Sequence, residues 1–329
     1  MRRIDPAGAG ELRGDIDPVD ADGILADVLY MCGLPLSISE GHPLHRRTRP
    51  ALALALALGG LLFGCGSPPD THSSQAGEKP FWRAEFDEAQ GARPSSRYWK
   101  TETGNRDAEG WGNDELQYYT RDAANSATDG SGHLLISARP APIGSNLPCY
   151  TQTSCPWTSA RLTTEGKVAL TYGRAEIRAK LPTGTGLLPA IWMLGDNGVE
   201  WPGQGEIDIC EVVGGEPRTV YGTAHGPTYF NENGIGGSIT LPGDASRTFH
   251  TYAVDKQPRR ITWLVDGKPY FTLTPSKLPA ERDWVFEQDM HLLLNVAVGG
   301  DWPGPPDAST PSPATMVVDY VRFYGKGRV

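Results

Sequence analysis

Residues 203–213, GQGEIDICEVV, carry three carboxylates in an otherwise apolar run: Glu206, Asp208 and Glu211. The alternation of acids with isoleucines predicts a strand, because successive side chains of a strand point to opposite faces. Glu206 and Asp208 then share one face, whereas Glu211 falls on the face of the isoleucines. An unpaired carboxylate buried on that face would be costly or would take up a proton. A regular strand therefore does not fit this run.

A β-bulge at about Ile209–Cys210 would remove the conflict. One extra residue reverses the alternation and returns Glu211 to the face of Glu206. Three carboxylates would then line one wall of a groove. Like charges at close range repel and separate their pKa values, so such a cluster indicates a site.

The chemistry that suits this cluster is glycoside cleavage. Two glutamates about 5 Å apart are the arrangement of a retaining glycosidase, in which one attacks the anomeric carbon and the other protonates the leaving oxygen. Calcium binding is an alternative, but bulky isoleucines between the acids suit a hard cation poorly, since calcium loops use turn residues such as Gly and Asn. An acid-rich exposed strand is the remaining alternative, and Gly205 and the nearby aromatic residues argue against it.

The composition of the chain indicates the class of ligand. The chain has 329 residues, 39% of them hydrophobic, with 40 Gly and 28 Pro, which suits one large domain or two small ones. The 39 acidic residues outnumber the 30 Lys and Arg, giving a net charge of −9, and no basic cluster follows residue 50. This balance disfavours nucleic acids and other polyanions as partners and favours a neutral ligand.

The chain after residue 80 has the pattern of strands. Residues 173–182, GRAEIRAKLP, alternate apolar with charged side chains, as in a strand with one solvated face. Asp266-Gly267 lies between two apolar runs, which predicts a hairpin because a type I′ turn needs residues that tolerate positive φ. Helical periodicity is not sustained and turn signals are frequent. We therefore expect an all-β fold of two antiparallel sheets packed face to face.

The N-terminal part resembles an export signal. A basic patch at 45–50, HRRTRP, precedes an apolar run at 51–63 that is shorter than the roughly 18 residues of a membrane-spanning helix. The run ends in LFGC, which resembles a bacterial lipoprotein cleavage site and makes Cys65 a candidate for lipidation. Ordinary secretion with cleavage nearby, or an uncleaved anchor, are the alternatives. We expect an extracellular or cell-envelope-anchored protein that meets the membrane only through such an anchor.

The expected organisation follows from these segments. Residues 1–44 receive no fold, and the export signal spans 45–65. A polar linker rich in Pro, Ser and Gly spans 66–80. Residues 81–329 form the predicted catalytic domain.

The cysteines fit an oxidising compartment. Cys149 and Cys155 lie six apart in a Pro-rich loop that a disulfide could close, and no metal-ligand spacing competes with that pairing. Cys210 is expected to be a buried apolar filler, because no base is evident beside it and the neighbouring acids would raise its pKa.

The acid run EIDICE (206–211) resembles the signature of glycoside hydrolase family 16 in its bulged, laminarinase-like form. Further segments match in the same order: GWGNDELQYYT (110–120), TSARLTT (158–164), LPAIWMLG (188–195), NVAVGGDWPG (295–304) and DYVRFY (319–324). The resemblance covers about residues 81–325. It implies a concanavalin A-like β-jelly-roll sandwich whose concave sheet forms a glycan cleft, and hydrolysis of β-glucans with retention. Cys210 replaces the Met that is common at the bulge, and both are soft apolar fillers.

The resemblance also implies roles for single residues. Glu206 matches the nucleophile, Asp208 the acid that hydrogen-bonds and tunes it, and Glu211 the general acid/base. The matched sugar-binding positions are Asn113, Arg161, Trp192, Trp201, His225, Asn295 and Trp302. Flat indole rings suit pyranose faces. Core packing is the alternative for each Trp, and a structural role is the alternative for His225.

Asp319, outside the acid run, is a further carboxylate that needs a partner. The alternation in MVVDYVRFYG places Asp319 on an apolar face with Val317, Val321 and Phe323. The resemblance implies a structural Ca²⁺ bound by Asp319, a backbone carbonyl near Gly132 and an acid near Glu85. Ordinary hydrogen bonding of Asp319 is the alternative.

We therefore expect a secreted, monomeric, retaining endo-β-1,3-glucanase that acts on β-glucan polysaccharide or oligosaccharide and needs no cofactor for catalysis. A mixed-linkage β-1,3-1,4-glucanase and a galactanase or agarase are alternatives within the family. The bulged motif together with GWGNDELQYY favours the first interpretation. A non-catalytic glucan-binding protein is an alternative of another class, and the intact acids argue against it.

Overall fold

The computed structural model describes residues 78–106, 109–151 and 153–329. The upstream segment, the export signal, Cys65 and most of the linker lie outside these residues, so those expectations stay predictions. The described chain is built from strands and four single-turn 3₁₀ helices, which confirms the all-β prediction. None of its helices is long and apolar enough to cross a membrane.

The first layer, here called the inner sheet, is antiparallel throughout. Its strand order is β2-β7-β16-β9-β10-β11-β12. These strands are β2 (Lys100–Glu102), β7 (Arg161–Thr163), β9 (Leu187–Gly195), β10 (Glu206–Glu211), β11 (Thr219–His225), β12 (Ile235–Thr240) and β16 (Met290–Val298).

The second layer, the outer sheet, has the order β15-β14-β13-β8-β17, and β17 then pairs with β1 and β5. Its strands are β1 (Trp82–Ala84), β4 (Ser126–Thr128), β5 (Leu134–Pro140), β8 (Ala169–Lys180), β13 (His250–Gln257), β14 (Arg260–Val265), β15 (Lys268–Leu273) and β17 (Ala314–Arg328). A side ladder adds the parallel pair β3 (Gln117–Tyr119) and β6 (Trp157–Ser159). The 3₁₀ helices are η1 (Gly110–Gly112), η2 (Asn231–Asn233), η3 (Pro275–Lys277) and η4 (Glu281–Asp283).

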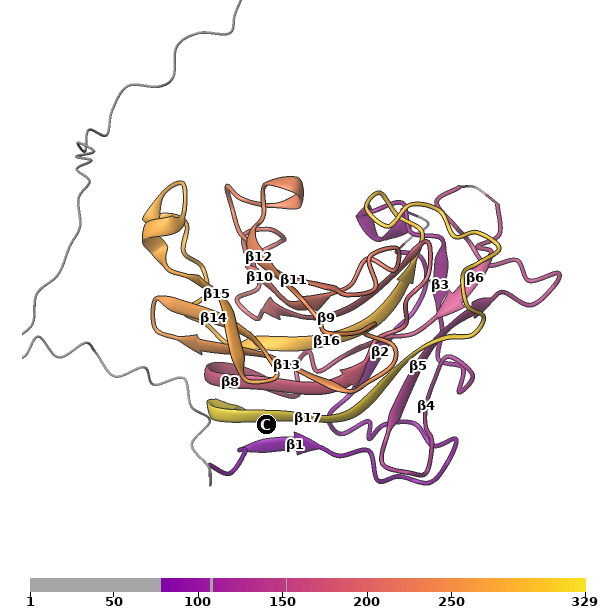
Figure 1. Ribbon diagram of the computed structural model, residues 1–329, viewed down its shortest axis with the longest axis horizontal. Coiled ribbons are helices and arrows are strands. Elements are labelled where there is room, and N and C mark those ends of the chain that lie inside the picture. Colours follow the sequence, from indigo (N-terminus) through magenta and orange to yellow (C-terminus); the bar gives the residue numbers. More distant parts are fainter. Residues whose placement is uncertain (1–77, 107–108, 152) are drawn as a thin grey trace, which may run out of the picture. The chain divides into compact units, whose positions relative to one another are not determined.

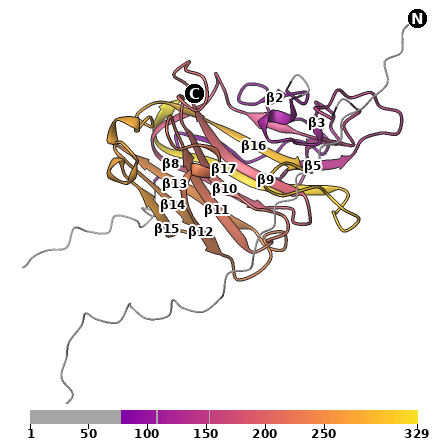
Figure 2. The same cartoon turned by 90° about the horizontal axis from the view of Figure 1, so that it is seen from above.

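The two layers are joined where β16 pairs with β8 at Met290 and Leu170, so all the strands form one hydrogen-bonded network. Figure 1 shows β9–β12 and β16 inside the bend of the sandwich and β1 and β17 outside it. Figure 2 agrees with Figure 1 in placing β14 and β15 at one end and β3 and β5 at the other. Apolar side chains from both sheets fill the space between the layers. This is the face-to-face packing that the sequence predicted.

Local patterns behave as expected in two places. In β8 the alternate residues Ala175, Ile177 and Ala179 are fully buried, which confirms a strand with one solvated face. Asp266 and Gly267 have φ of 50° and 73° in the turn between β14 and β15. Both central residues of the turn therefore adopt the positive φ that the hairpin prediction required.

The predicted face of Asp319 is wrong. The register of β17 against β8 shifts between Val318 and Tyr320, so Asp319 is an extra residue in the strand. The apolar face of β17 consequently carries Val318 and Val321, and Asp319 is half-buried on the other side. A bulge lets the strand keep its apolar residues in the core while the carboxylate stays near water.

Candidate active site

The predicted bulge is present in β10. Against β9, Asp208 pairs with Trp192 and Cys210 with Ile191, which leaves Ile209 as the extra residue. Ile209 and Cys210 are both buried in the core, as the filler role of Cys210 requires. The alternation then resumes, and Glu211 returns to the face of Glu206.

The strand register places the three acids in three neighbouring rows of the inner sheet. Glu206 lies between Leu194 and His225, Asp208 between Trp192 and Thr223, and Glu211 between Ala190 and Tyr221. Cross-strand neighbours share a face of the sheet. The solvent-facing side of the inner sheet therefore carries Asp208 flanked by a glutamate on each side along the strand.

Burial and mutual repulsion set the protonation of this cluster. Burial first, and then the Asp208 charge, raise the pKa of Glu206 to about 8. Burial raises the pKa of Asp208, opposed by hydrogen bonding to Glu206. Burial and the charges of Asp208 and Glu206 raise the pKa of Glu211 well above its usual range. At neutral pH the cluster therefore holds shared protons instead of three full charges.

Two neighbours act on the first acids. The Trp201 indole N–H donates to Oε2 of Glu206 at 2.5 Å, which favours the ionised form of that carboxylate. Nε2 of His225 lies 3.1 Å from Oδ2 of Asp208. The charge that His225 gains on protonation lowers the pKa of both Glu206 and Glu211. His225 therefore belongs to the electrostatic surroundings of the acids.

Trp192, Arg161 and Asn295 form one connected group beside the acids. The guanidinium of Arg161 lies 4.6 Å from the ring centre of Trp192, and the Trp192 indole N–H donates to Oδ1 of Asn295 at 2.7 Å. Trp192 is half-buried and alternates with the buried Ile191 and Met193, so it lies on the opposite face of β9. Its ring face is in contact with an arginine, so it is a less open platform than the sequence suggested.

A buried polar network supports this group from below. The amide of Asn295 donates to the Tyr119 hydroxyl at 3.1 Å, and that hydroxyl lies 3.5 Å from the buried carboxyl of Glu115. Gln117 donates to Glu115 at 2.5 Å, and the exposed Asn113 donates to it at 3.3 Å. Burial raises the pKa of Glu115, which fits a carboxyl held inside a hydrogen-bonded network. Asn113 is thereby connected to the buried network, and its backbone carbonyl accepts the N–H of Asp301 just after β16.

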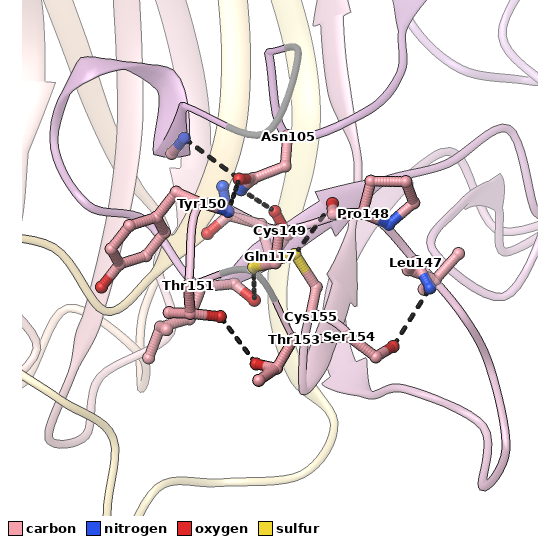
Figure 3. Close-up of a disulfide and its surroundings, with 12 residues drawn as sticks. Asn105, Gln117, Leu147, Pro148, Cys149, Tyr150, Thr151, Thr153, Ser154 and Cys155 are labelled. Atoms are coloured by element: carbon pink, nitrogen blue, oxygen red, sulfur yellow. Dashed lines mark hydrogen bonds between the residues drawn. A yellow bond between two sulfur atoms is a disulfide. The ribbon is translucent and has the colours of Figure 1, made fainter. Parts of the chain in front are cut away.

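The disulfide loop holds the neighbouring segment in place (Figure 3). Cys149 and Cys155 are joined, with their Cα atoms 5.0 Å apart. Asn105 accepts the backbone N–H of Tyr150 and that of Gly110, each at 3.0 Å. Asn105 thus ties the disulfide loop to the start of η1, the turn that contains Trp111.

Trp111 faces the same arginine as Trp192. The guanidinium of Arg161 lies 4.4 Å from the ring of Trp111 and between the two indoles, where cation–π attraction holds it. Trp111 has a φ of 57°, a conformation that needs support from its surroundings. The tether through Asn105 and the disulfide loop provides that support.

Two aromatic pairs flank the acids. Trp201 is 41% exposed and packs edge-on against Phe230 at 5.5 Å, beside Glu206. Trp302 is 49% exposed and packs edge-on against Tyr221 at 5.0 Å, and Tyr221 is the cross-strand partner of Glu211. Exposed indoles are thus available at both ends of the acid row.

The predicted calcium residues approach one another along β17. Val318 pairs with Leu134 of β5 and Val321 with Ala84 of β1, so Asp319 lies between the start of β5 and the end of β1. A Cβ at Gly132 would be 3.9 Å from the carbonyl oxygen of Glu85.

The carboxylates there already have partners. Arg322 binds Glu85 through two hydrogen bonds of 2.9 Å, and Arg178 binds Asp319. Within the described ranges, no group of three or more His, Cys, Asp or Glu is arranged to hold a metal ion. A cation would therefore depend on main-chain carbonyls and on Oδ1 of Asp319, and the carboxylate of Glu85 does not fit as a ligand.

Sequence reasoning missed four residues of the site: Trp111, Glu115, Tyr119 and Tyr221. The first three lie in GWGNDELQYYT. Trp111 contacts Arg161 of β7 and Tyr119 contacts Asn295 of β16, which are distant in sequence, and Glu115 joins the site through Tyr119. Tyr221 could have been found by pairing β11 with the bulged β10, because it lies opposite Glu211.

Comparison with known proteins gives the family. The sequence model of the family described as glycosyl hydrolases family 16 matches residues 113–322 of this chain. The chain is 40% identical over 306 residues to a β-glucanase from Rhodothermus marinus, an alignment that covers 89% of this chain and 99% of that protein.

Solved structures agree. The laminarinase catalytic domain from Thermotoga maritima superposes with a TM-score of 0.69 at 43% identity, covering 76% of this chain and 98% of that one. A non-specific endo-β-1,3(4)-glucanase of family 16, solved with 1,3-β-D-cellobiosyl-glucose at its active site, gives a TM-score of 0.68 at 35% identity over 76% and 96% of the two chains. With its jelly-roll sandwich and bulged acid strand, this chain belongs to glycosyl hydrolase family 16 and is a glycoside hydrolase.

Proposed function

We propose that this protein is a retaining endo-β-1,3-glucanase. The observation that carries the proposal is the bulge at Ile209, which puts Glu206, Asp208 and Glu211 on one solvent-facing surface of the inner sheet. A retaining glycosidase needs one carboxylate to attack and one carboxylic acid to donate a proton on the same surface. Asp208 between them shares protons with its neighbours.

The protein groups account for each step. Glu211, whose raised pKa keeps it protonated, donates its proton to the leaving glycosidic oxygen. Glu206 attacks the anomeric carbon in its ionised form, whose share of the protein grows as the pH approaches the Glu206 pKa of about 8. Trp201 donates a hydrogen bond to Glu206, which stabilises its ionised form. Glu211, now ionised, then takes a proton from water, which attacks the glycosyl-enzyme and releases Glu206. Carboxylates and water suffice, so this reaction needs no cofactor.

The substrate assignment rests on surface chemistry and on the relatives. The exposed Trp201 and Trp302 offer apolar faces to pyranose rings on either side of the acids. A net charge of −9 disfavours anionic glycans. The β-glucanase and laminarinase relatives support a β-glucan, and the relative that acts on β-1,3(4)-glucan makes a mixed-linkage substrate the second candidate.

One experiment tests the substrate. Residues 66–329 are incubated with laminarin, curdlan, lichenan and agarose, and the products are sized over time. Early release of oligosaccharides of mixed length from laminarin and curdlan supports endo action on β-1,3-glucan. Activity on lichenan alone or on agarose alone would contradict the substrate assignment. If none of the four glycans yields a product, the proposed hydrolytic activity is wrong and a glucan-binding protein is favoured.

Retention is tested separately by proton NMR of the new reducing ends. A retaining enzyme releases the β-anomer first, which then equilibrates to the mixture. First appearance of the α-anomer would contradict a covalent intermediate on Glu206.

We also propose export and lipidation at Cys65. The described disulfide Cys149–Cys155 supports an oxidising compartment, because cytosolic thiols are kept reduced. In a bacterial host, labelled palmitate should be incorporated into the wild-type protein but not into the Cys65→Ser variant. A wild-type chain secreted without label would restrict the proposal to ordinary secretion.

Calcium is proposed as a structural ion bound by Asp319 and main-chain carbonyls at Glu85 and Gly132. The position of Asp319 between β1 and β5 supports it. When bound, the cation would join three separate segments, so EDTA should lower the melting temperature and added Ca²⁺ should restore it. An unchanged melting temperature rejects the proposal.

A further inference from the structure

The bulge in β10 is connected to the opposite sheet by one hydrogen bond. The indole N–H of Trp263, on β14 of the outer sheet, donates to the backbone carbonyl of Asp208 at 2.7 Å. Trp263 is fully buried between the layers. Asp208 immediately precedes the extra residue Ile209, so the hydrogen bond meets the strand where its register changes.

The strand beside the bulge provides the space for this contact. On β11, Asp208 pairs with Thr223 and Glu211 with Tyr221, so Gly222 alone lies opposite the bulged pair. A Cβ at Gly222 would come within 2.4 Å of the Trp263 ring. Any larger residue at Gly222 would therefore collide with the indole, and glycine allows the ring to lie under the bulge.

We propose that Trp263 is a positioning residue that acts through the Asp208 carbonyl to hold the bulge, and thereby to hold Glu211 on the face of Glu206. This inference rests on the proposed function. A carbonyl that accepts a hydrogen bond from the opposite sheet has its peptide plane fixed, and the next peptides form the bulge. Glu206 lies before the bulge, with regular pairing on both sides, so the general acid/base Glu211 is the group that depends on Trp263.

The chemistry separates this role from general packing. A displaced general acid slows cleavage of a glucan, whose leaving alcohol needs a proton. It affects a 2,4-dinitrophenyl glycoside much less, because that leaving group departs without one. A displaced general base also slows hydrolysis of the glycosyl-enzyme, and azide, which needs no base, overcomes that loss.

The test compares Trp263→Phe with Trp82→Phe. Trp82 is also buried in the core, and its indole N–H has no hydrogen-bond partner among the described residues. Both variants remove a similar volume, but only the first removes the hydrogen bond. We expect Trp263→Phe to lower kcat/KM on laminarin by about 10- to 100-fold, the scale of a catalytic group displaced by about 1 Å. On 2,4-dinitrophenyl β-laminaribioside, kcat/KM should change less than about threefold, and azide should raise kcat.

Trp82→Phe should match the wild type on both substrates, with no azide effect. The inference is wrong if both variants lose activity to the same extent. It is also wrong if Trp263→Phe lowers kcat/KM equally on both substrates and azide does not raise its kcat. If Trp263→Phe does not fold, benzothienylalanine at position 263 keeps the ring shape and removes only the N–H, and the same comparison decides. A wild type that cleaves neither substrate rejects the proposed function instead.

Discussion

Strand β10 of the inner sheet and strand β17 of the outer sheet each contain a bulge that involves an aspartate. In β10 the extra residue is Ile209, next to Asp208. In β17 it is Asp319 itself. Both bulges keep apolar residues in the core and turn acids toward the surface. The two strands thus solve the same packing problem.

The charges around the two bulges differ. Asp319 is paired with Arg178, and Glu85 nearby is paired with Arg322. Within the described chain, the acids of β10 have no ion pair with Lys or Arg, and the imidazole of His225 is the one basic side chain within ion-pair distance of them. Neutralised acids stabilise the outer sheet, whereas the acids of β10 keep raised pKa values that suit proton transfer. The two bulges therefore differ in the charge state of their acids, which matches a structural role for β17 and the proposed catalytic role for β10.

The largest expected effect comes from removing the proposed nucleophile of β10. Glu206→Gln should lower laminarin hydrolysis by about 10³-fold or more, because the covalent step is lost. Asp255→Asn, which removes an acid paired with Arg260 in the outer sheet, should stay within about twofold of the wild type, as a partly exposed ion pair contributes little. Reducing-sugar release measures both. Near-normal activity of Glu206→Gln would contradict the assignment of the nucleophile.

A second test sharpens the electrostatic difference. The Asp208 charge raises the pKa of Glu206 and of Glu211. Asp208→Asn should therefore lower both, so that Glu206 ionises and Glu211 deprotonates at lower pH. Both limbs of the profile of kcat/KM against pH should move to lower pH by about one unit, equivalent to about 1.4 kcal/mol. Limbs that stay in place would show that Asp208 does not tune the pair.

The smallest expected effects concern stability and have opposite signs. The folded pKa of Glu206, about 8, lies above its ordinary value of 4.5. The folded state thus binds more protons between these values, and stability falls as pH rises through that window. Glu206→Gln should raise the melting temperature at pH 8 by about 4 °C, which corresponds to about 1–2 kcal/mol in a domain of this size, and leave it unchanged at pH 4.

Asp319→Asn is the matched variant in β17. It removes the partly exposed ion pair with Arg178 and should lower the melting temperature at pH 8 by at most about 2–4 °C, the result of losing up to about 1 kcal/mol. Calorimetry of both variants at the same pH gives the comparison. A loss of stability in both would mean that the acids of β10 stabilise the fold as those of β17 do.

Much of the fold and of the acid cluster could be predicted, because the alternation of side chains is a local property. The bulge near Cys210 followed from the cost of burying Glu211. The cost of burying Asp319 among valines predicts the second bulge in the same way, whereas we expected a partner for a buried Asp319 instead. A misplaced acid in an apolar strand is therefore evidence for a bulge before it is evidence for a buried pair.

The remaining parts of the site depend on contacts between distant segments. Arg161 lies between Trp111 and Trp192, and Trp263 reaches Asp208 from the other sheet. No pattern within one strand contains these relations. Export, lipidation at Cys65, the monomeric state and calcium binding stay predictions.

The tether between Asn105 and the disulfide loop has a practical consequence. The acids lie on β10 in the middle of the inner sheet, whereas Trp111 depends on a loop closed by Cys149–Cys155. We expect chain produced in a reducing cytosol to keep its acids in place while the turn that carries Trp111 loosens. Such a preparation would bind glucan more weakly but still hydrolyse it. Protein produced under reducing conditions would therefore show a higher KM than protein with the disulfide formed.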